Sequence, residues 1–125
     1  METLEIGKSL VDLCNQGQFD QAVESHYDDD IVSIEGAGGP SGDQRVEGLD
    51  AVRAKGKWWS ENHEVHAFEA YGPFTAQGDD RFAVYFSLEV TPKATGQRMA
   101  MTEVGLYQVR DGKIVEERFF YNMAG

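Results

Sequence analysis

The segment from Arg81 to Thr91 alternates between apolar and more polar side chains at every step. Successive side chains of a β-strand point to opposite faces of the sheet, so a strict alternation predicts a strand with one buried side. Such a strand is typical of an antiparallel sheet whose second face is open to water. The predicted inner side chains are Phe82, Val84, Phe86, Leu88 and Val90, and the outer ones are Ala83, Tyr85, Ser87 and Glu89.

The other periodic segments place helices first and strands last. Helices are predicted over residues 3–15, 19–27 and 49–62, and further strands over residues 31–35, 65–74, 98–110 and 113–121. The glycine-rich residues 36–48 and the acidic run Asp28–Asp30 are predicted to be loops. This order indicates an α+β fold, and a length of 125 residues predicts one domain over residues 1–125.

Charge and cysteine content narrow the classes of partner. The chain has 22 acidic residues against 11 lysines and arginines, a net charge of −11, so we expect no nucleic-acid or membrane partner. No run approaches the roughly 18 apolar residues of a membrane span, and the N-terminus does not resemble a secretion signal. The single cysteine, Cys14, excludes a disulfide framework and a cysteine-rich zinc site. The expected location is therefore the cytoplasm.

The turn at Asp111-Gly112 decides which side chains of the last two strands share a face. A two-residue turn would place Arg110 opposite Lys113, whereas a three-residue turn with Gly112 in the left-handed conformation shifts the pairing by one. We predict the three-residue turn, because it sorts apolar groups better. It places on one face Met99, Met101, Glu103, Gly105, Tyr107 and Val109 with Val115, Glu117, Phe119, Tyr121 and Met123.

This register puts Glu103 and Glu117 among apolar side chains. A buried carboxylate without a partner costs several kcal/mol or takes up a proton. Two interpretations remain open. The glutamates either pair with Arg, His or Tyr and fill the core, or they line a pocket and move protons or orient a ligand.

The succession of elements resembles the nuclear-transport-factor-2-like superfamily, and within it the SnoaL-like group. The resemblance covers essentially the whole chain, and the order and spacing of its stretches are more specific than any one of them. The matching stretches are residues 27–35, residues 48–52 leading to Trp58 and Trp59, residues 72–74, residues 81–84, residues 103–107 and residues 109–117.

The resemblance implies a cone-shaped fold, in which three N-terminal helices pack in a strongly curved antiparallel sheet that encloses a pocket at its open end. Members of the superfamily include a ketosteroid isomerase, polyketide cyclases, dehydratases, an epoxide hydrolase and non-catalytic binders. They generally use no metal or organic cofactor, and many form dimers through the outer face of the sheet. We therefore expect no cofactor and a homodimer. The apolar outer positions predicted for such an interface are Val104, Leu106, Ile114 and Phe120.

Two mechanisms of the superfamily lack their residues in this chain. The isomerase has its base at the end of the first strand, and Glu35 stands nearest to that position. Leu10 and Gly105 fall where the isomerase has the Tyr and Asp of its oxyanion hole, and loss of one such donor costs about 3 kcal/mol in the transition state. Glu103, Gly105 and Phe119 fall where the epoxide hydrolase has an Asp-Arg-Asp group. We predict neither mechanism.

We expect instead a pocket for a small hydrophobic molecule, with an isomerase, cyclase or dehydratase that uses carboxyl groups as general acid and base. Glu35 or Glu103 would abstract a proton, and His66 or Tyr121 would hold the oxygen. His63 and His66 point to opposite faces of a strand, so they predict no metal site. The candidate ligand-binding residues are Trp58, Phe86, Met101, Tyr107, Glu117, Phe119 and Tyr121. The alternative is a non-catalytic ligand-binding or dimerisation module on the same scaffold.

Overall fold

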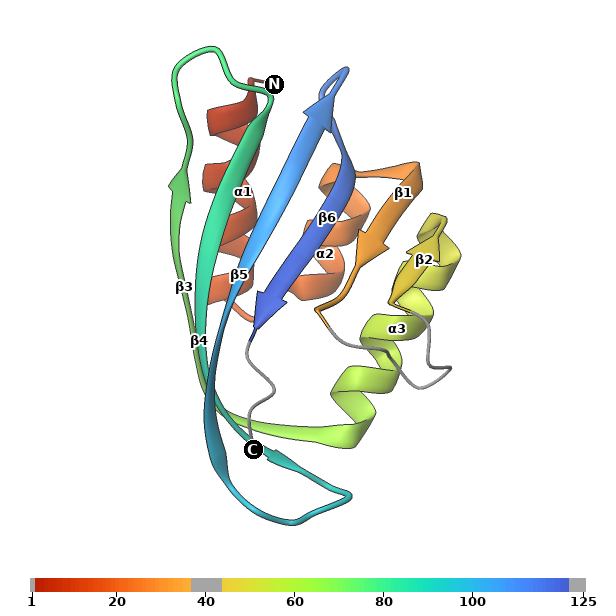
Figure 1. Ribbon diagram of the computed structural model, residues 1–125, viewed down its shortest axis with the longest axis vertical. Helices are drawn as coiled ribbons and strands as arrows, with labels where there is room; N and C mark the ends of the chain where they lie inside the picture. Colours follow the sequence, from red (N-terminus) through yellow and green to blue (C-terminus); the bar gives the residue numbers. More distant parts are fainter. Residues whose placement is uncertain (1, 37–43, 122–125) are drawn as a thin grey trace.

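The computed structural model describes residues 2–36 and 44–121, and it confirms the α+β fold (Figure 1). Helices α1 and α2 come first, and after a short strand pair and α3 the chain ends in four long strands. No helix in these two ranges is long and apolar enough to cross a membrane. The elements are α1 (Thr3–Asn15), α2 (Phe19–His26), β1 (Tyr27–Ile34), β2 (Arg45–Glu47), α3 (Leu49–Asn62), β3 (His63–Phe74), β4 (Arg81–Pro92), β5 (Met99–Arg110) and β6 (Lys113–Tyr121).

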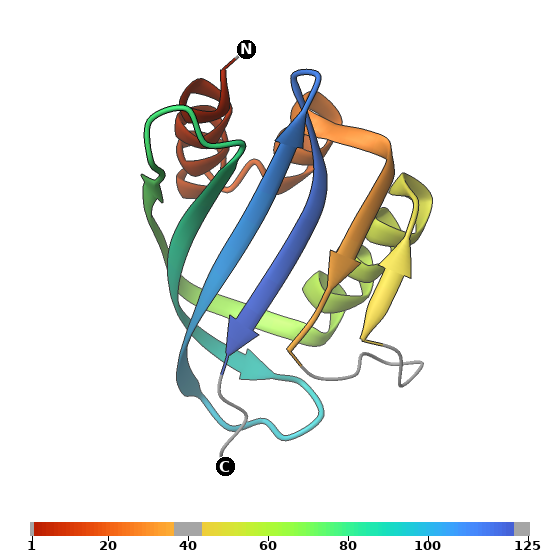
Figure 2. The same ribbon diagram turned by 45° about the horizontal axis from the view of Figure 1, so that its top comes forward.

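The sheet has six strands in the order β2-β1-β6-β5-β4-β3, and it is curved and open, with the helices on one of its faces (Figure 2). The prediction of a purely antiparallel sheet was wrong for one pair, because β1 runs parallel to β6. Parallel neighbours need a long connection between them, and here β1 and β6 lie near opposite ends of the chain. This pairing brings the end of β1 beside the middle of β6.

The first strand pair departs from the predicted loops. The acidic run Asp28–Asp30 lies within β1, directly after Tyr27, instead of forming a loop, and Asp29 and Asp30 are exposed to solvent. Part of the glycine-rich loop also forms a strand, β2, which pairs antiparallel with β1. Glu35, whose backbone N–H donates to the Gln44 carbonyl, lies directly after β1. The second half of β1 agrees with the strand predicted over residues 31–35, whereas the first half of β1 and all of β2 were missed, because pairing to a neighbouring strand overrides a weak local strand pattern.

The core lies between the helices and the inner face of the long strands. The five inner side chains predicted for β4 are all buried, which confirms the alternation. Helix α1 packs against them with a face that includes Ile6 and Leu10. The helical spacing of residues 49–62 predicts that Gly56 shares the inward face of α3 with Val52 and Trp59. Gly56 is exposed in the structure, and Lys55 lies on the inward face with Val52 and Trp59 instead.

The last hairpin uses the two-residue turn, so the predicted three-residue turn was wrong. Asp111 and Gly112 both have positive φ, 52° and 77°, and Arg110 pairs with Lys113. This conformation matches the twist of the flanking strands.

A bulge in β6 nevertheless restores the predicted faces. Gln108 pairs with Glu116 and Val109 pairs with Ile114, which leaves Val115 as the extra residue. Beyond the bulge, Glu103, Gly105 and Tyr107 share a face with Glu117, Phe119 and Tyr121 as predicted. Before it, Ile114 turns inward and is fully buried, so its predicted outer position was wrong. Met123 lies outside the described residues.

Candidate functional site

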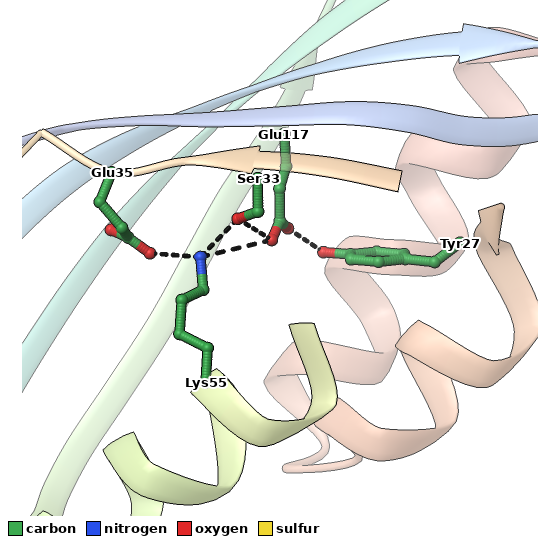
Figure 3. A network of polar contacts seen from close by, with 5 residues as sticks. All are labelled: Tyr27, Ser33, Glu35, Lys55 and Glu117. Carbon is green, nitrogen blue, oxygen red and sulfur yellow. Dashed lines mark hydrogen bonds and ion pairs between the residues drawn. The ribbon is translucent and has the colours of Figure 1, made fainter. Parts of the chain in front are cut away.

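A polar network crosses the inner face between the sheet and α3 (Figure 3). Strand β1 supplies Tyr27 and Ser33, and Glu35 follows it directly. Strand β6 supplies Glu117, and α3 supplies Lys55 from the opposite side. The parallel register of β1 and β6 sets Ser33 directly beside Glu117, so the one parallel pair in the sheet assembles this network.

Glu117 is the buried centre of the network, with only 3% of the residue exposed. Its Oε1 accepts a hydrogen bond from the Tyr27 hydroxyl, and its Oε2 accepts one of 2.7 Å from Ser33. Lys55 Nζ lies 3.9 Å from the same Oε2. Burial raises the pKa of Glu117, while Lys55 and the two hydroxyl donors act to lower it. Both carboxylate oxygens are occupied, so Glu117 fits the interpretation of a core-filling, paired glutamate.

Lys55 joins Glu35 to the centre of the network at Ser33 and Glu117. Its ammonium donates to Ser33 Oγ and, at 2.6 Å, to Glu35 Oε1. The ammonium also lies 5.5 Å from the centroid of the Phe119 ring. Sequence reasoning missed this residue, although a signal was present: Lys55 stands three residues after Val52 on the inward stripe of the helix. A lysine on an apolar helix face requires an acidic partner inside the protein.

Glu103 differs from the other two interior glutamates because no cation or donor holds it within the described residues. It lies on β5 between Phe86 and Tyr121 on the neighbouring strands. Burial, followed by the charges of Glu35 and Glu117, raises the pKa of Glu103 to about 7, against a smaller opposing effect of Lys55. Glu103 can therefore take up or release a proton near neutral pH.

Tyr107 is a buried aromatic residue close to Glu103 and Glu117. Its ring stacks on Phe82, with centroids 4.9 Å apart, and meets the edge of Phe119 at 6.2 Å. A Cβ on Gly105 would lie 3.0 Å from the Tyr107 hydroxyl oxygen, so the tyrosine leans along β5 toward Glu103. Burial is the largest cause that raises the pKa of Tyr107, and it keeps the phenol protonated at neutral pH. The absence of a side chain at Gly105 is what makes this position of the ring possible.

Comparison with known proteins identifies the family to which this chain belongs. The sequence model of the SnoaL-like domain matches residues 1–121. The chain belongs to the SnoaL-like domain family. No curated protein matches this SnoaL-like chain.

Several solved structures have a fold similar to that of this SnoaL-like chain. A crystal structure of a candidate SnoaL-like polyketide cyclase from Mesorhizobium loti is 47% identical with a TM-score of 0.90, over 97% of this chain and 100% of that one. A candidate isomerase from Bacillus subtilis is 18% identical with a TM-score of 0.76, over 96% and 86% of the two chains. A candidate polyketide cyclase from a Silicibacter species is 16% identical with a TM-score of 0.73, over 98% and 90%. The last two similarities show the fold alone.

The SnoaL-like fold brings only part of the predicted site together. Glu35, Glu103, Glu117 and Phe119 surround Lys55 or influence one another electrostatically. Phe86 is buried, and Met101, paired with Leu88, and Tyr121, paired with Glu103, are partly buried on the same face of the sheet.

His66 and Trp58 are not brought to the acids. His66 lies exposed on β3, the edge strand farthest from β1, and its Nε2 is 2.7 Å from Thr91 Oγ1. Trp58 is exposed near the end of α3, where its ring meets the edge of His63 at 6.0 Å, and Trp59 is the tryptophan that packs on the core. Neither position supports the predicted role of His66 as a catalytic group or of Trp58 in the ligand site.

Two surface hollows lie elsewhere on the molecule. One, of about 430 Å³, is at the start of α3 and includes Asp29, Glu47 and Arg53. The other, of about 300 Å³, lies beside Phe74 and Leu106. Neither is lined by Glu103 or Glu117, so the pocket at the open end of the cone stays a prediction. Among the described residues, no cluster of three His, Cys, Asp or Glu side chains is arranged to hold a metal ion.

Proposed function

We propose that this SnoaL-like protein binds a small hydrophobic carbonyl compound at the inner face of its sheet and catalyses an isomerase-, cyclase- or dehydratase-type reaction, with Glu103 as general base and acid. The observation that carries the proposal is the contrast between the interior glutamates. Glu35 and Glu117 are held by Lys55 and by hydroxyl donors, whereas Glu103 has an interior position and no such partner within the described residues.

The proposed chemistry follows from this contrast. The Glu103 carboxylate removes a proton from the carbon next to the carbonyl, and the C–H electron pair moves into the carbonyl to form an enolate. Protonated Glu103 can return the proton to a different carbon, which completes an isomerisation. Alternatively the enolate carbon attacks a second carbonyl group and closes a ring, and protonated Glu103 gives its proton to the alkoxide that forms. A pKa of about 7 for Glu103 supports both halves of the cycle at neutral pH. The name of the Mesorhizobium polyketide cyclase, which is 47% identical, is consistent with this reaction class.

We expect the protein to accelerate exchange of the acidic α-hydrogens of 1-indanone for deuterium in D2O, measured by proton NMR. This flat, neutral ketone stands in for the unidentified substrate. The rate above a protein-free blank should rise with pH and level off above about pH 7, because ionised Glu103 is the active form. A rate equal to the blank at every pH would remove the catalytic proposal. Binding of the ketone without exchange would favour the non-catalytic ligand-binding alternative.

We further propose a homodimer through the outer face of the sheet. One row of apolar side chains crosses four neighbouring strands on this face, and each residue is between 36% and 50% exposed. An exposed apolar row that runs across several strands supplies the kind of surface that protein–protein contacts use. The row consists of Tyr71, Tyr85, Val104 and Phe120.

We expect Val104→Lys to weaken the dimer, because each interface would then hold two additional positive charges in place of apolar contacts. Sedimentation velocity should show a shift from dimer to monomer at concentrations where the unsubstituted protein stays dimeric. Gln97→Lys, in the exposed loop between β4 and β5, is the control for the added charge and should not change the sedimentation. A monomeric unsubstituted protein would contradict the proposal.

A further inference from the structure

Lys55 has one N–H group more than its partners among residues 2–36 and 44–121 use. An ammonium group carries three donors, and the described residues accept two of them, at Ser33 Oγ and Glu35 Oε1. The 3.9 Å separation from Glu117 Oε2 is too long for a hydrogen bond. The remaining neighbour is the face of the Phe119 ring. A charged hydrogen bond to an oxygen is stronger than a cation–π contact of this kind, so an oxygen-bearing ligand can replace the ring as partner.

The position of this donor relative to Glu103 is set by the sheet. Phe119, which lies under the ammonium, pairs across the strands with Gly105. Gly105 is two residues from Glu103 on the same face of β5, a distance of about 7 Å along a strand. Glu103 also senses the charge of Lys55. The cation and the unpartnered acid therefore flank the same aromatic surface.

We propose that Lys55 is a catalytic residue of this site, which donates its third N–H to the carbonyl oxygen of a neutral, enolisable ligand while Glu103 faces the adjacent C–H. This inference rests on the proposed function and assigns the group that binds the oxygen. In the reaction, the C–H bond breaks, the proton goes to a Glu103 oxygen, and the electron pair becomes negative charge on the ligand oxygen at Lys55. The Lys55 hydrogen bond strengthens as this charge develops, which lowers the barrier.

The charge of the interior selects a neutral ligand. Lys55 is already neutralised by Glu35 at 2.6 Å, and Glu117 adds a second carboxylate at 3.9 Å. A ligand with its own carboxylate would meet more negative than positive charge on this face. A ketone, ester or aldehyde brings only a dipole, whose oxygen end suits the ammonium. Lys55 thus takes the role of binding the oxygen, which the sequence had led us to expect of His66 or Tyr121.

The test compares 1-indanone with indane, which has the same shape without the oxygen. The unsubstituted protein should bind 1-indanone about tenfold more tightly than indane, and the infrared carbonyl stretch of the bound ketone should fall relative to its value in hexane. In Lys55→Met the affinity for 1-indanone should drop about tenfold to that of indane, the stretch should return toward the hexane value, and indane binding should persist. Lys57→Met, two residues along the same helix with a 77% exposed side chain, should behave like the unsubstituted protein.

The outcomes separate the two proposals. Equal affinities for the two probes, or a lowered carbonyl stretch that survives Lys55→Met, would overturn the role of Lys55 and leave the pocket and Glu103 in place. Failure of both probes to bind would remove the proposed function together with this inference. If Lys55→Met does not fold, the double variant Lys55→Met/Glu117→Gln replaces it, because this variant removes one positive and one negative charge together. The ratio of its affinities for 1-indanone and indane then tests the role of Lys55 in the same way.

Discussion

Glu103→Gln should make the protein more stable above neutral pH and inactive in the 1-indanone exchange assay. Burial raises the pKa of Glu103 from 4.5 to about 7 in the folded protein. A difference of this size between the folded and unfolded chains corresponds to about 3 kcal/mol, by which ionisation of Glu103 destabilises the fold. The exchange rate should fall about a hundredfold or more, because an amide cannot accept the proton.

The size of the stability effect depends on pH. Since the folded pKa is the higher one, the folded chain holds the Glu103 proton between pH 4.5 and about 7, where the unfolded chain has lost it. Stability contributed by this proton is complete below the unfolded pKa and is lost as the pH rises through the folded value. The gain from Glu103→Gln should therefore be largest at about pH 9 and near zero at about pH 4.

Urea unfolding of both proteins at these two pH values measures the effect. The change between the two pH values is the decisive quantity, because the fixed cost of placing an amide on this face cancels from it. Glu64→Gln, at an exposed position on β3, is the control and should show no comparable pH-dependent gain. A gain for Glu103→Gln that is the same at both pH values would mean that Glu103 ionises as freely as a glutamate in water.

The sequence contains enough information for most of the fold. The alternation along β4 predicts its buried face correctly, and the apolar sorting of β5 and β6 places Glu103 and Glu117 on the inner face. The turn prediction failed because one bulge at Val115 and one three-residue turn have the same effect on the register. The distribution of apolar side chains over the two faces determines the total shift in register between β5 and β6. It does not show whether the shift occurs in the turn or at a bulge.

The site was harder to predict because it depends on contacts between distant segments. Ser33 and Glu117 become neighbours only through the parallel pairing of β1 with β6, which local pattern does not encode. Lys55 was not predicted as a site residue, because Gly56 fits the helical spacing of the inward face of α3 equally well. The exposed positions of His66 and Trp58 depend on a bulge in β3 and on the rotation of α3, and neither has a local signal.

Lys55→Met should lower the free energy of unfolding by about 2–4 kcal/mol at neutral pH. Loss of one partner from a fully buried ion pair costs about 3–5 kcal/mol, because the remaining charge is left without compensation. The Lys55 and Glu35 side chains retain 19% and 21% exposure, so solvent reduces this cost somewhat. The Lys55→Met chain would hold Glu35, Glu103 and Glu117 on one inner face without a cation bonded to any of them in the described residues.

Lys57→Met provides a matched control for this prediction. Lys57 is paired with Glu61 at 3.8 Å, but its side chain is largely exposed, so the change should stay within about 0.5 kcal/mol. Adding Glu117→Gln to Lys55→Met should recover part of the loss, since the amide keeps partners at Tyr27 and Ser33 and removes one buried negative charge. Acidification should also narrow the gap between Lys55→Met and the unsubstituted protein, because protonation removes the uncompensated charge. Equal destabilisation by Lys55→Met and Lys57→Met would show that the interior carboxylates do not depend on Lys55.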